Sequence, residues 1–399
     1  MLTTALAPGE PIDITVDYSN IIYDDDPDSP GYPDIDGCTL FLYLLPAGIA
    51  VDANRDGTIV FSGEARDTTS QDAPFRFWCN DDNDGLPNSE GDVIDPSFPD
   101  YEDGVIQTLR DLEDFARLHL FIDAFHKELT DGTFRIGLKF KSAGGTTPKI
   151  WIYRSTDPEG SDSYLKDEQA ALSQVSGRDV EALGEVTDGA PMLLPQDFWT
   201  GNNARNSKKC LLFEAGAEGK GQLVMTVNKS DGTQIAEVPG VWLDLKTIKR
   251  MYQRHAGSGK NQWGSVRFEK DPSEQPNAIV FVHGWRMAPE TASNFAETFY
   301  KRLWHRGFKG RFAAFRWDTH WSDKYGWLPY AGQAIDSYLA KYNDSEHNAW
   351  LAGSSLASFT NSLPSTYSKN VAAHSMGNIV VGSALLASRL LKNWPFDRC

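Results

Sequence analysis

The amino-acid sequence predicts a multi-domain protein with a β-rich front and middle, followed by a parallel sheet with flanking helices. Two observations carry this prediction. Short alternating apolar segments, separated by Asp-, Gly- and Pro-rich turns, fill residues 1–257 and are typical of antiparallel sheets. After residue 277, continuous apolar runs alternate with helical periodicity, as in parallel sheets covered by helices.

The front region, residues 1–115, combines short strands with acidic loops and an amphipathic helix expected at 104–118. It holds 26 acidic and 4 basic residues, whereas the rest of the chain carries a net charge of +5. Such an acidic surface repels nucleic acids and anionic membranes and favours divalent cations. We therefore expect no nucleic-acid partner for this region.

The middle region, residues 116–257, is expected to be β-sandwich-like. Its strand-like segments are LHLFIDAF, TFRIGLKF, KIWIYR, CLLFEA, GQLVMTVNK and TQIAEV. The SDG tripeptide before the last of these indicates a hairpin in which Gly232 supplies a positive φ. Residues 258–276 interrupt the pattern with Gly, Pro and charged residues, and we expect them to form a linker.

The last region, residues 277–399, reads as three strands that alternate with helices. The strands are AIVFVHGW, RFAAFRW and NVAAHS, and the helices are expected at 289–307, 345–363 and 378–393. This order predicts a parallel sheet, which places its ligands at the carboxyl ends of the strands.

Ser375 lies at the end of the third strand, in NVAAHSMGNIV, and the following helix begins directly after it. A nucleophile elbow needs small residues two positions before and after the serine, because strand and helix backbones approach closely there. Ala373 and Gly377 occupy these two positions. The helix would also direct its positive N-terminus at the serine.

His283, Gly284 and Trp285 end the first of these strands. Gly284 would let the backbone turn so that the Trp285 N–H points to the same place as the Met376 N–H. Two such donors make an oxyanion hole.

These motifs resemble the first half of an α/β-hydrolase domain. VHGW, RFAAFRW and AHSMGN are most similar to bacterial esterase- or lipase-like proteins with an HGY-type strand end and an AHSMGN elbow. The resemblance implies that Ser375 is the nucleophile, that Trp285 and Met376 supply oxyanion N–H groups, and that the substrate is a small ester or lipid. It implies no organic cofactor. The commonest elbow has Gly where this chain has Ala373.

The front 270 residues, with VDANRDGTIVF and FRFWCNDDNDG, resemble the N-terminal part of large bacterial proteins that carry such a domain. We therefore expect an extracellular or cell-surface location. The opening segment MLTTALAPGEPIDI has neither the basic nor the apolar part of a signal peptide, and no run approaches the ~18 apolar residues of a membrane span.

The acid and the base of the triad are missing from their expected place. In this superfamily the order is Ser, then Asp or Glu, then His, but no histidine follows Ser375 and the one later carboxylate side chain is Asp397. We therefore expect the chain to be a fragment with little or no activity. His374 is interpreted as a packing residue or an outer contact of the site rather than as the base, because successive side chains at a strand end point to different faces.

Four assignments have alternatives. His283 is interpreted as a structural residue of the turn, and Asp318 with His320 is an improvised acid–base pair to be tested. The aromatic residues between 321 and 342 form either a lid over an acyl-binding cleft or ordinary packing. The whole chain is alternatively a non-catalytic surface or adhesion protein that uses the hydrolase-like region as a scaffold.

Two acidic loops are candidate calcium sites. Their oxygen-bearing residues alternate before a glycine, as in loops that wrap a hard cation: Asp52, Asn54 and Asp56 in the first, and Asn80, Asp82 and Asp84 in the second. Position twelve of the first loop is Gly63 where an EF-hand has a carboxylate, so a solvated turn is the alternative. We expect a structural rather than a catalytic ion.

The four cysteines, Cys38, Cys79, Cys210 and Cys399, show no CxxC spacing, which argues against a zinc site and a disulfide-stapled scaffold. A single Cys38–Cys79 bridge remains open if the protein is exported.

Overall fold

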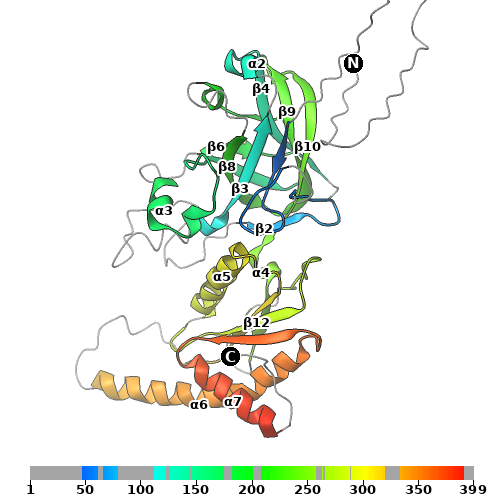
Figure 1. Ribbon diagram of the computed structural model, residues 1–399. Coiled ribbons are helices and arrows are strands. Elements are labelled where there is room, and N and C mark those ends of the chain that lie inside the picture. The colour runs from blue at the N-terminus through cyan, green and yellow to red at the C-terminus, as the bar shows by residue number, and fades with distance from the viewer. Residues whose placement is uncertain are drawn as a thin grey trace, which may run out of the picture.

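A large mixed sheet and a smaller parallel sheet, with a few helices, make up the computed structural model (Figure 1). The structure describes residues 47–61, 66–79, 112–122, 126–142, 145–174, 182–200, 208–257, 263, 266–287, 289–319 and 333–390. The predicted β-rich class with a parallel sheet near the end is thereby confirmed for these residues. The division into separate domains stays a prediction.

Within the described residues, the large sheet contains ten strands in the order β1-β3-β8-β2-β10-β9-β4-β7, with β5 paired to β8 and β6 paired to β5. Strand β2 is parallel to both of its neighbours, and the other pairs are antiparallel. The strands are β1 (Ala47–Ala50), β2 (Phe75–Cys79), β3 (Phe115–Ile122), β4 (Phe134–Ser142), β5 (Lys149–Arg154), β6 (Ala182–Val186), β7 (Met192–Leu193), β8 (Lys208–Ala217), β9 (Gly219–Lys229) and β10 (Gln234–Thr247).

Short helices join these strands. They are η1 (Leu112–Asp114), α2 (His126–Thr130), η2 (Ser163–Leu165), α3 (Glu168–Gln174) and η3 (Gln196–Trp199). The β9–β10 turn has Gly232 at a φ of 86°, so the predicted hairpin is confirmed. Strands from both sides of residue 115 belong to the same sheet.

The helix predicted at 104–118 is wrong for its last four residues, because strand β3 begins at Phe115. The segment pairs with β1 on one side and β8 on the other. Its residues Leu118, Leu120 and Ile122 are buried in the core at the two-residue spacing of a strand. Pairing with residues distant in the sequence therefore outweighs the local helical pattern.

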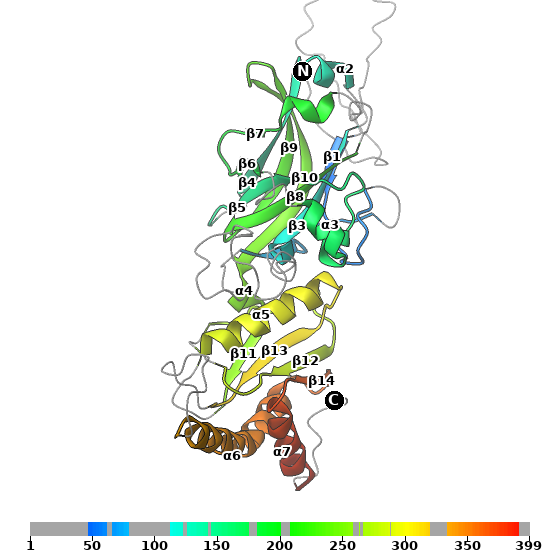
Figure 2. The same cartoon turned by 90° about the vertical axis from the view of Figure 1, so that its left-hand side faces the viewer.

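In the part of the chain that the structure describes, the small sheet has four parallel strands in the order β11-β13-β12-β14. Helix α5 covers one face, and α6 and α7 cover the other (Figure 2). Helix α6 begins well before the predicted residue 345. The elements are α4 (Ile248–Met251), β11 (Gln253–Ala256), β12 (Asn277–Val282), α5 (Pro289–His305), β13 (Arg311–Arg316), α6 (Gln333–Ser362), β14 (Ser368–Ala373) and α7 (Gly377–Leu390).

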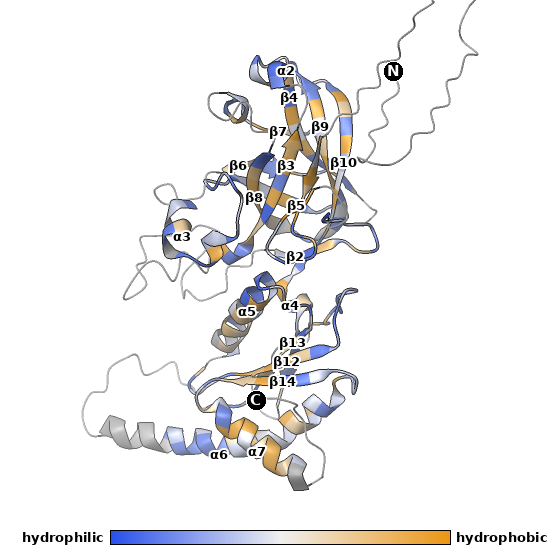
Figure 3. Cartoon of the chain, in the orientation of Figure 1, coloured by the Kyte–Doolittle hydropathy of each residue, from blue (hydrophilic) through white to orange (hydrophobic). Residues whose placement is uncertain are grey.

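The two inner strands of the small sheet, β12 and β13, are largely apolar because both of their faces are covered. In β13, Phe312 and Ala314 pack on the α5 side, whereas Ala313 and Phe315 pack against α6 and α7. Figure 3 shows hydrophobic residues along the middle of the strands and on α7, with more hydrophilic residues along α6. The continuous apolar runs of the sequence thus mark strands buried on both sides.

Helix α5 joins the two sheets. One hydrophobic cluster contains residues of the large sheet, of α5 and of the adjoining face of the small sheet. Trp304 of α5 packs edge-on against Phe75, Phe77 and Trp78 of β2. The fully buried Lys301 Nζ lies 2.7 Å from the Asp114 carboxylate of η1. The large sheet is therefore packed onto the helix that follows β12.

No helix in the described part of the chain is long and apolar enough to cross a membrane.

Candidate active site

The turn between β14 and α7 holds Ser375 in a strained backbone conformation. Its φ is 50°, a left-handed value that costs a residue with a side chain about 1–3 kcal/mol. The His374 N–H donates to the Val282 carbonyl at 3.0 Å, and α7 begins as the Gly377 N–H donates to the His374 carbonyl at 2.9 Å. Ser375 is exposed at the carboxyl end of β14, immediately before the helix.

Two glycines bring this turn into backbone contact with the end of β12. A Cβ atom on Gly377 would lie 2.6 Å from the Val282 carbonyl oxygen and 2.7 Å from that of His283. A Cβ atom on Gly284 would lie 2.6 Å from the His374 ring. The structure thus brings the two sequence motifs together. The backbone contacts at Gly377 leave no room for a side chain, whereas a Cβ atom at Gly284 would require the exposed His374 ring to move.

The topology places these two strand ends at a point where the strand order reverses. From β12 the chain passes to β13 on one side and then to β14 on the other side of β12. Such a reversal of strand order is a switch point, where the connections leave a crevice at the carboxyl ends of the strands. Ser375, Gly284 and Trp285 lie at this edge.

His283 is fully engaged in the turn. It is 1% exposed, its Nδ1 lies 2.8 Å from the Gly284 carbonyl oxygen, and its Nε2 accepts the Trp317 N–H at 3.2 Å. The Trp317 indole N–H donates back to the His283 carbonyl at 2.8 Å. Burial lowers the pKa of His283 to about 4, so the ring is neutral near pH 7. It ties β12 to β13.

Trp285 is held by α6, a role that the sequence does not indicate. Its indole N–H donates to the buried Ser345 hydroxyl at 3.0 Å, and Tyr342 packs edge-on against its ring. Tyr342 is 39% exposed. Of the aromatic residues predicted to form a lid or packing, it is the one whose side chain the structure describes, and it contacts Trp285.

The other predicted site residues differ in their exposure and in the elements that carry them. The exposed His374 ring stacks on Phe295 of α5, with 5.7 Å between the ring centres. Ala373 ends β14, Met376 is buried, and Asp318 is half-buried after β13. Within the described residues, no group forms a hydrogen bond with the Ser375 hydroxyl. His320 lies outside the described residues.

The first calcium candidate forms a tight loop, in which side-chain oxygens accept hydrogen bonds from backbone N–H groups of the same loop. The Asp52 carboxylate accepts the N–H groups of Asp56 and Gly57 at 3.1 and 3.0 Å, and Asn54 also accepts the Asp56 N–H at 2.8 Å. Asp52 is paired with Arg117 at 2.6 Å. A cation in this loop would compete with the guanidinium for the Asp52 oxygens.

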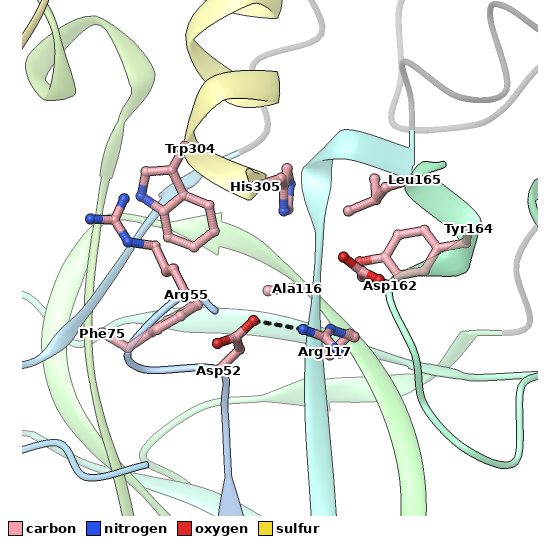
Figure 4. A pocket seen from close by; sticks show the side chains of 10 residues that line it. All are labelled: Asp52, Arg55, Phe75, Ala116, Arg117, Asp162, Tyr164, Leu165, Trp304 and His305. Carbon is pink, nitrogen blue, oxygen red and sulfur yellow. Dashed lines mark hydrogen bonds and ion pairs between the residues drawn. The ribbon is translucent and has the colours of Figure 1, made fainter. Parts of the chain in front are cut away.

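This loop also contacts α5. The Arg55 guanidinium lies over Trp304 at 4.9 Å and donates to the Phe308 carbonyl at 3.1 Å. Figure 4 shows a small cavity between the loop, β3 and α5, with the Asp52–Arg117 pair on its wall. Its volume of about 20 Å³ accommodates about one water molecule, so it holds no organic ligand.

The second calcium candidate lies wholly outside the described residues, and the candidate disulfide lies partly outside them. Asn80, Asp82 and Asp84 lie outside the described residues. Within the described ranges no cluster of three or more His, Cys, Asp or Glu side chains is arranged around a metal position. Cys79 is buried at the end of β2, and Cys38 lies outside the described part, so the bridge between them stays a prediction.

Calcium binding at the first loop is expected to raise the melting temperature of chelator-treated protein by several degrees, because a ligand at 100 times its Kd adds about 2.7 kcal/mol. Asp56→Ala should abolish the increase measured by calorimetry. Asp231→Ala is the matched control, because Asp231 accepts the Thr233 N–H as Asp56 accepts the Thr58 N–H. An equal melting temperature with and without calcium contradicts the prediction.

Comparisons with known proteins add little to this site. No family model matches the chain, and no curated protein matches it. A solved structure named BspA_C_mut matches with 14% sequence identity and a TM-score of 0.16. The match covers 36% of this chain and 52% of that one, so the chain spans about half the length of that protein. A similarity this low shows neither a shared fold nor a shared function.

Proposed function

We propose that the protein is a serine hydrolase that cleaves a carboxyl ester or lipid by acyl transfer through Ser375. The observation that carries this proposal is the left-handed φ of 50° at Ser375, in the turn from a parallel strand to a helix. Backbone strain of this kind is concentrated at functional sites. In a strand–turn–helix context it presents a serine hydroxyl at the edge of the sheet.

Charge stabilisation is the second element of the proposal. The Met376 N–H lies between the serine and α7, a helix of 14 residues whose N-terminal end carries a partial positive charge. The second donor is assigned to the Trp285 N–H, because Gly284 packs directly against His374 beside the serine. Two donors at this position would stabilise the oxyanion formed when Ser375 Oγ attacks a carbonyl carbon.

The serine proton needs an acceptor, and neither of the two described histidines at this turn, His283 and His374, is arranged to take it. The ring nitrogens of His283 are engaged in the turn, and His374 stacks on Phe295. Efficient turnover therefore needs a base that is not among the described residues. We do not propose a particular residue for this role. With oxyanion donors alone, a small residual rate remains.

The second candidate is a non-catalytic surface or adhesion role. One observation favours it: no described side chain is hydrogen-bonded to the Ser375 hydroxyl. An elbow serves equally well as a compact strand-to-helix connection, because fold does not imply function.

Covalent labelling by a fluorophosphonate probe distinguishes the two roles. The hydrolase proposal predicts slow labelling that mass spectrometry locates at Ser375, and loss of the adduct in Ser375→Ala. Ser354→Ala is the matched control, because Ser354 is an exposed serine on α6. Labelling of Ser375 no faster than that of Ser354 favours the non-catalytic role. Labelling as fast as in a complete hydrolase shows that an internal base exists.

A further inference from the structure

Two arginines, Arg254 of β11 and Arg316 of β13, lie on the same face of the small sheet. The strands are parallel, with Arg254 opposite Ala314 and Ala256 opposite Arg316, so the two arginines are diagonal neighbours. Phe312 and Ala314 face α5, and the two-residue period of β13 places Arg316 on that face as well.

Arg254 faces the same side. Its guanidinium lies 4.9 Å from the centre of the Trp263 ring, and the Trp263 indole N–H donates to the carbonyl of Pro289 at 2.9 Å. Pro289 is the first residue of α5. Arg254 therefore lies near the N-terminal end of this helix, which adds a further partial positive charge.

Both guanidiniums are incompletely hydrogen-bonded among the described residues. The Nε atoms of Arg254 and Arg316 are both buried and without a hydrogen bond, and Arg316 is only 5% exposed. Burial lowers the pKa of Arg316, and the nearby Asp318 opposes this. Buried Arg117, by contrast, is paired with Asp52 at 2.6 Å. An unsatisfied donor on a buried charged group is costly, so a hydrogen-bond acceptor is expected here.

Arg316 lies at the edge of the sheet where open parallel sheets place their ligands, and Arg254 lies one diagonal step before it. Arg316 is the last residue of β13, and its charge acts on His283 at the end of β12. Ligands of open parallel sheets lie at these carboxyl ends. The pair lies under α5, whereas Ser375 lies at the end of β14 beyond β12.

We propose that Arg254 and Arg316 form a binding site for an oxyanion, the carboxylate or phosphate group of a small molecule. A planar guanidinium donates two parallel hydrogen bonds to either group, which makes a pair of arginines well suited to this recognition. The site is independent of the chemistry assigned to Ser375. Asp318 is the one described carboxylate whose charge competes with the anion for Arg316.

Calorimetric titration of the full chain with inorganic phosphate, and separately with acetate, tests the site. One equivalent is expected to bind, and the anion that binds more tightly identifies the group. Arg254→Gln and Arg316→Gln should each weaken binding about tenfold or more, as expected for lost hydrogen bonds from a charged donor. Asp318→Asn should strengthen it. Arg306→Gln, an exposed arginine just after α5, should change nothing.

The proposal is overturned if neither anion binds, or if both arginine variants bind as tightly as the unchanged protein. A weaker Asp318→Asn complex also contradicts it, because removal of a competing carboxylate cannot weaken an anion site. Melting in chloride buffer shows which variants are folded. If Arg316→Gln does not fold, the half-buried Arg254 and the Asp318 variants decide the outcome.

Discussion

Lys301→Met is expected to lower the free energy of unfolding by about 3–5 kcal/mol. Lys301 is fully buried, and its ammonium lies 2.7 Å from Asp114, whose side chain is 4% exposed. Asp114 also accepts the Trp78 indole N–H at 2.5 Å, so its carboxylate is fixed between α5 and β2. Removal of the lysine charge leaves this carboxylate buried without its ion pair, and that loss far exceeds the loss of packing.

Denaturant unfolding measures this effect, with the double variant Lys301→Met/Asp114→Asn as the decisive comparison. Asparagine keeps an acceptor for Trp78 but carries no charge, so the double variant should recover most of the lost stability. Lys270→Met is the matched control, because Lys270 is 57% exposed and its pair with Glu274 spans 3.8 Å; it should change stability by less than about 1 kcal/mol. An unchanged transition midpoint for Lys301→Met would contradict the prediction.

Gly377→Ala is expected to destabilise the protein by about 1–3 kcal/mol and to abolish labelling of Ser375. The added methyl would lie 2.6 Å from the Val282 carbonyl oxygen and 2.7 Å from that of His283. Both atoms belong to the backbone of the central strand, so they cannot move aside alone. The helix must shift away from β12, and the serine moves with it.

Gly382→Ala is the matched control in the same helix. A Cβ atom there meets nothing within 4 Å, so the substitution should stabilise α7 by up to about 1 kcal/mol and leave labelling unchanged. The two variants are compared by thermal melting and by fluorophosphonate labelling. Normal labelling of Gly377→Ala would show that the close contact between β12 and α7 does not position the serine.

Both sheets contribute residues to one hydrophobic core, so the folding of the small sheet is coupled to that of the large sheet. Residues of the large sheet, α5 and the small sheet belong to one hydrophobic cluster, and Lys301 and Trp304 of α5 are buried against η1 and β2. The helix that follows the His283–Gly284 turn therefore depends on the large sheet for its burial. Its inner face would be exposed without that sheet.

Short-range sequence patterns were sufficient to predict much of the fold. The apolar runs of β12, β13 and β14 predict strands buried on both faces, and the SDG turn predicts the hairpin at Gly232. Ala373 and Gly377 around Ser375 predict a close strand-to-helix turn, and Gly377 does lie against the β12 backbone. These features depend on residues a few positions apart, so their signal is present in the order of the amino acids.

Tertiary structure decided the rest, because it depends on which distant segments meet. Strand β3 has a helical pattern at its start but pairs with β1 and β8. Helix α6 extends to Gln333, and its Ser345 holds Trp285, sixty residues earlier in the chain. The Lys301–Asp114 pair and the neighbouring Arg254 and Arg316 arise only when strands and helices far apart in sequence are packed together. Burial and charge pairing are properties of that packing, and short-range periodicity carries no information about them.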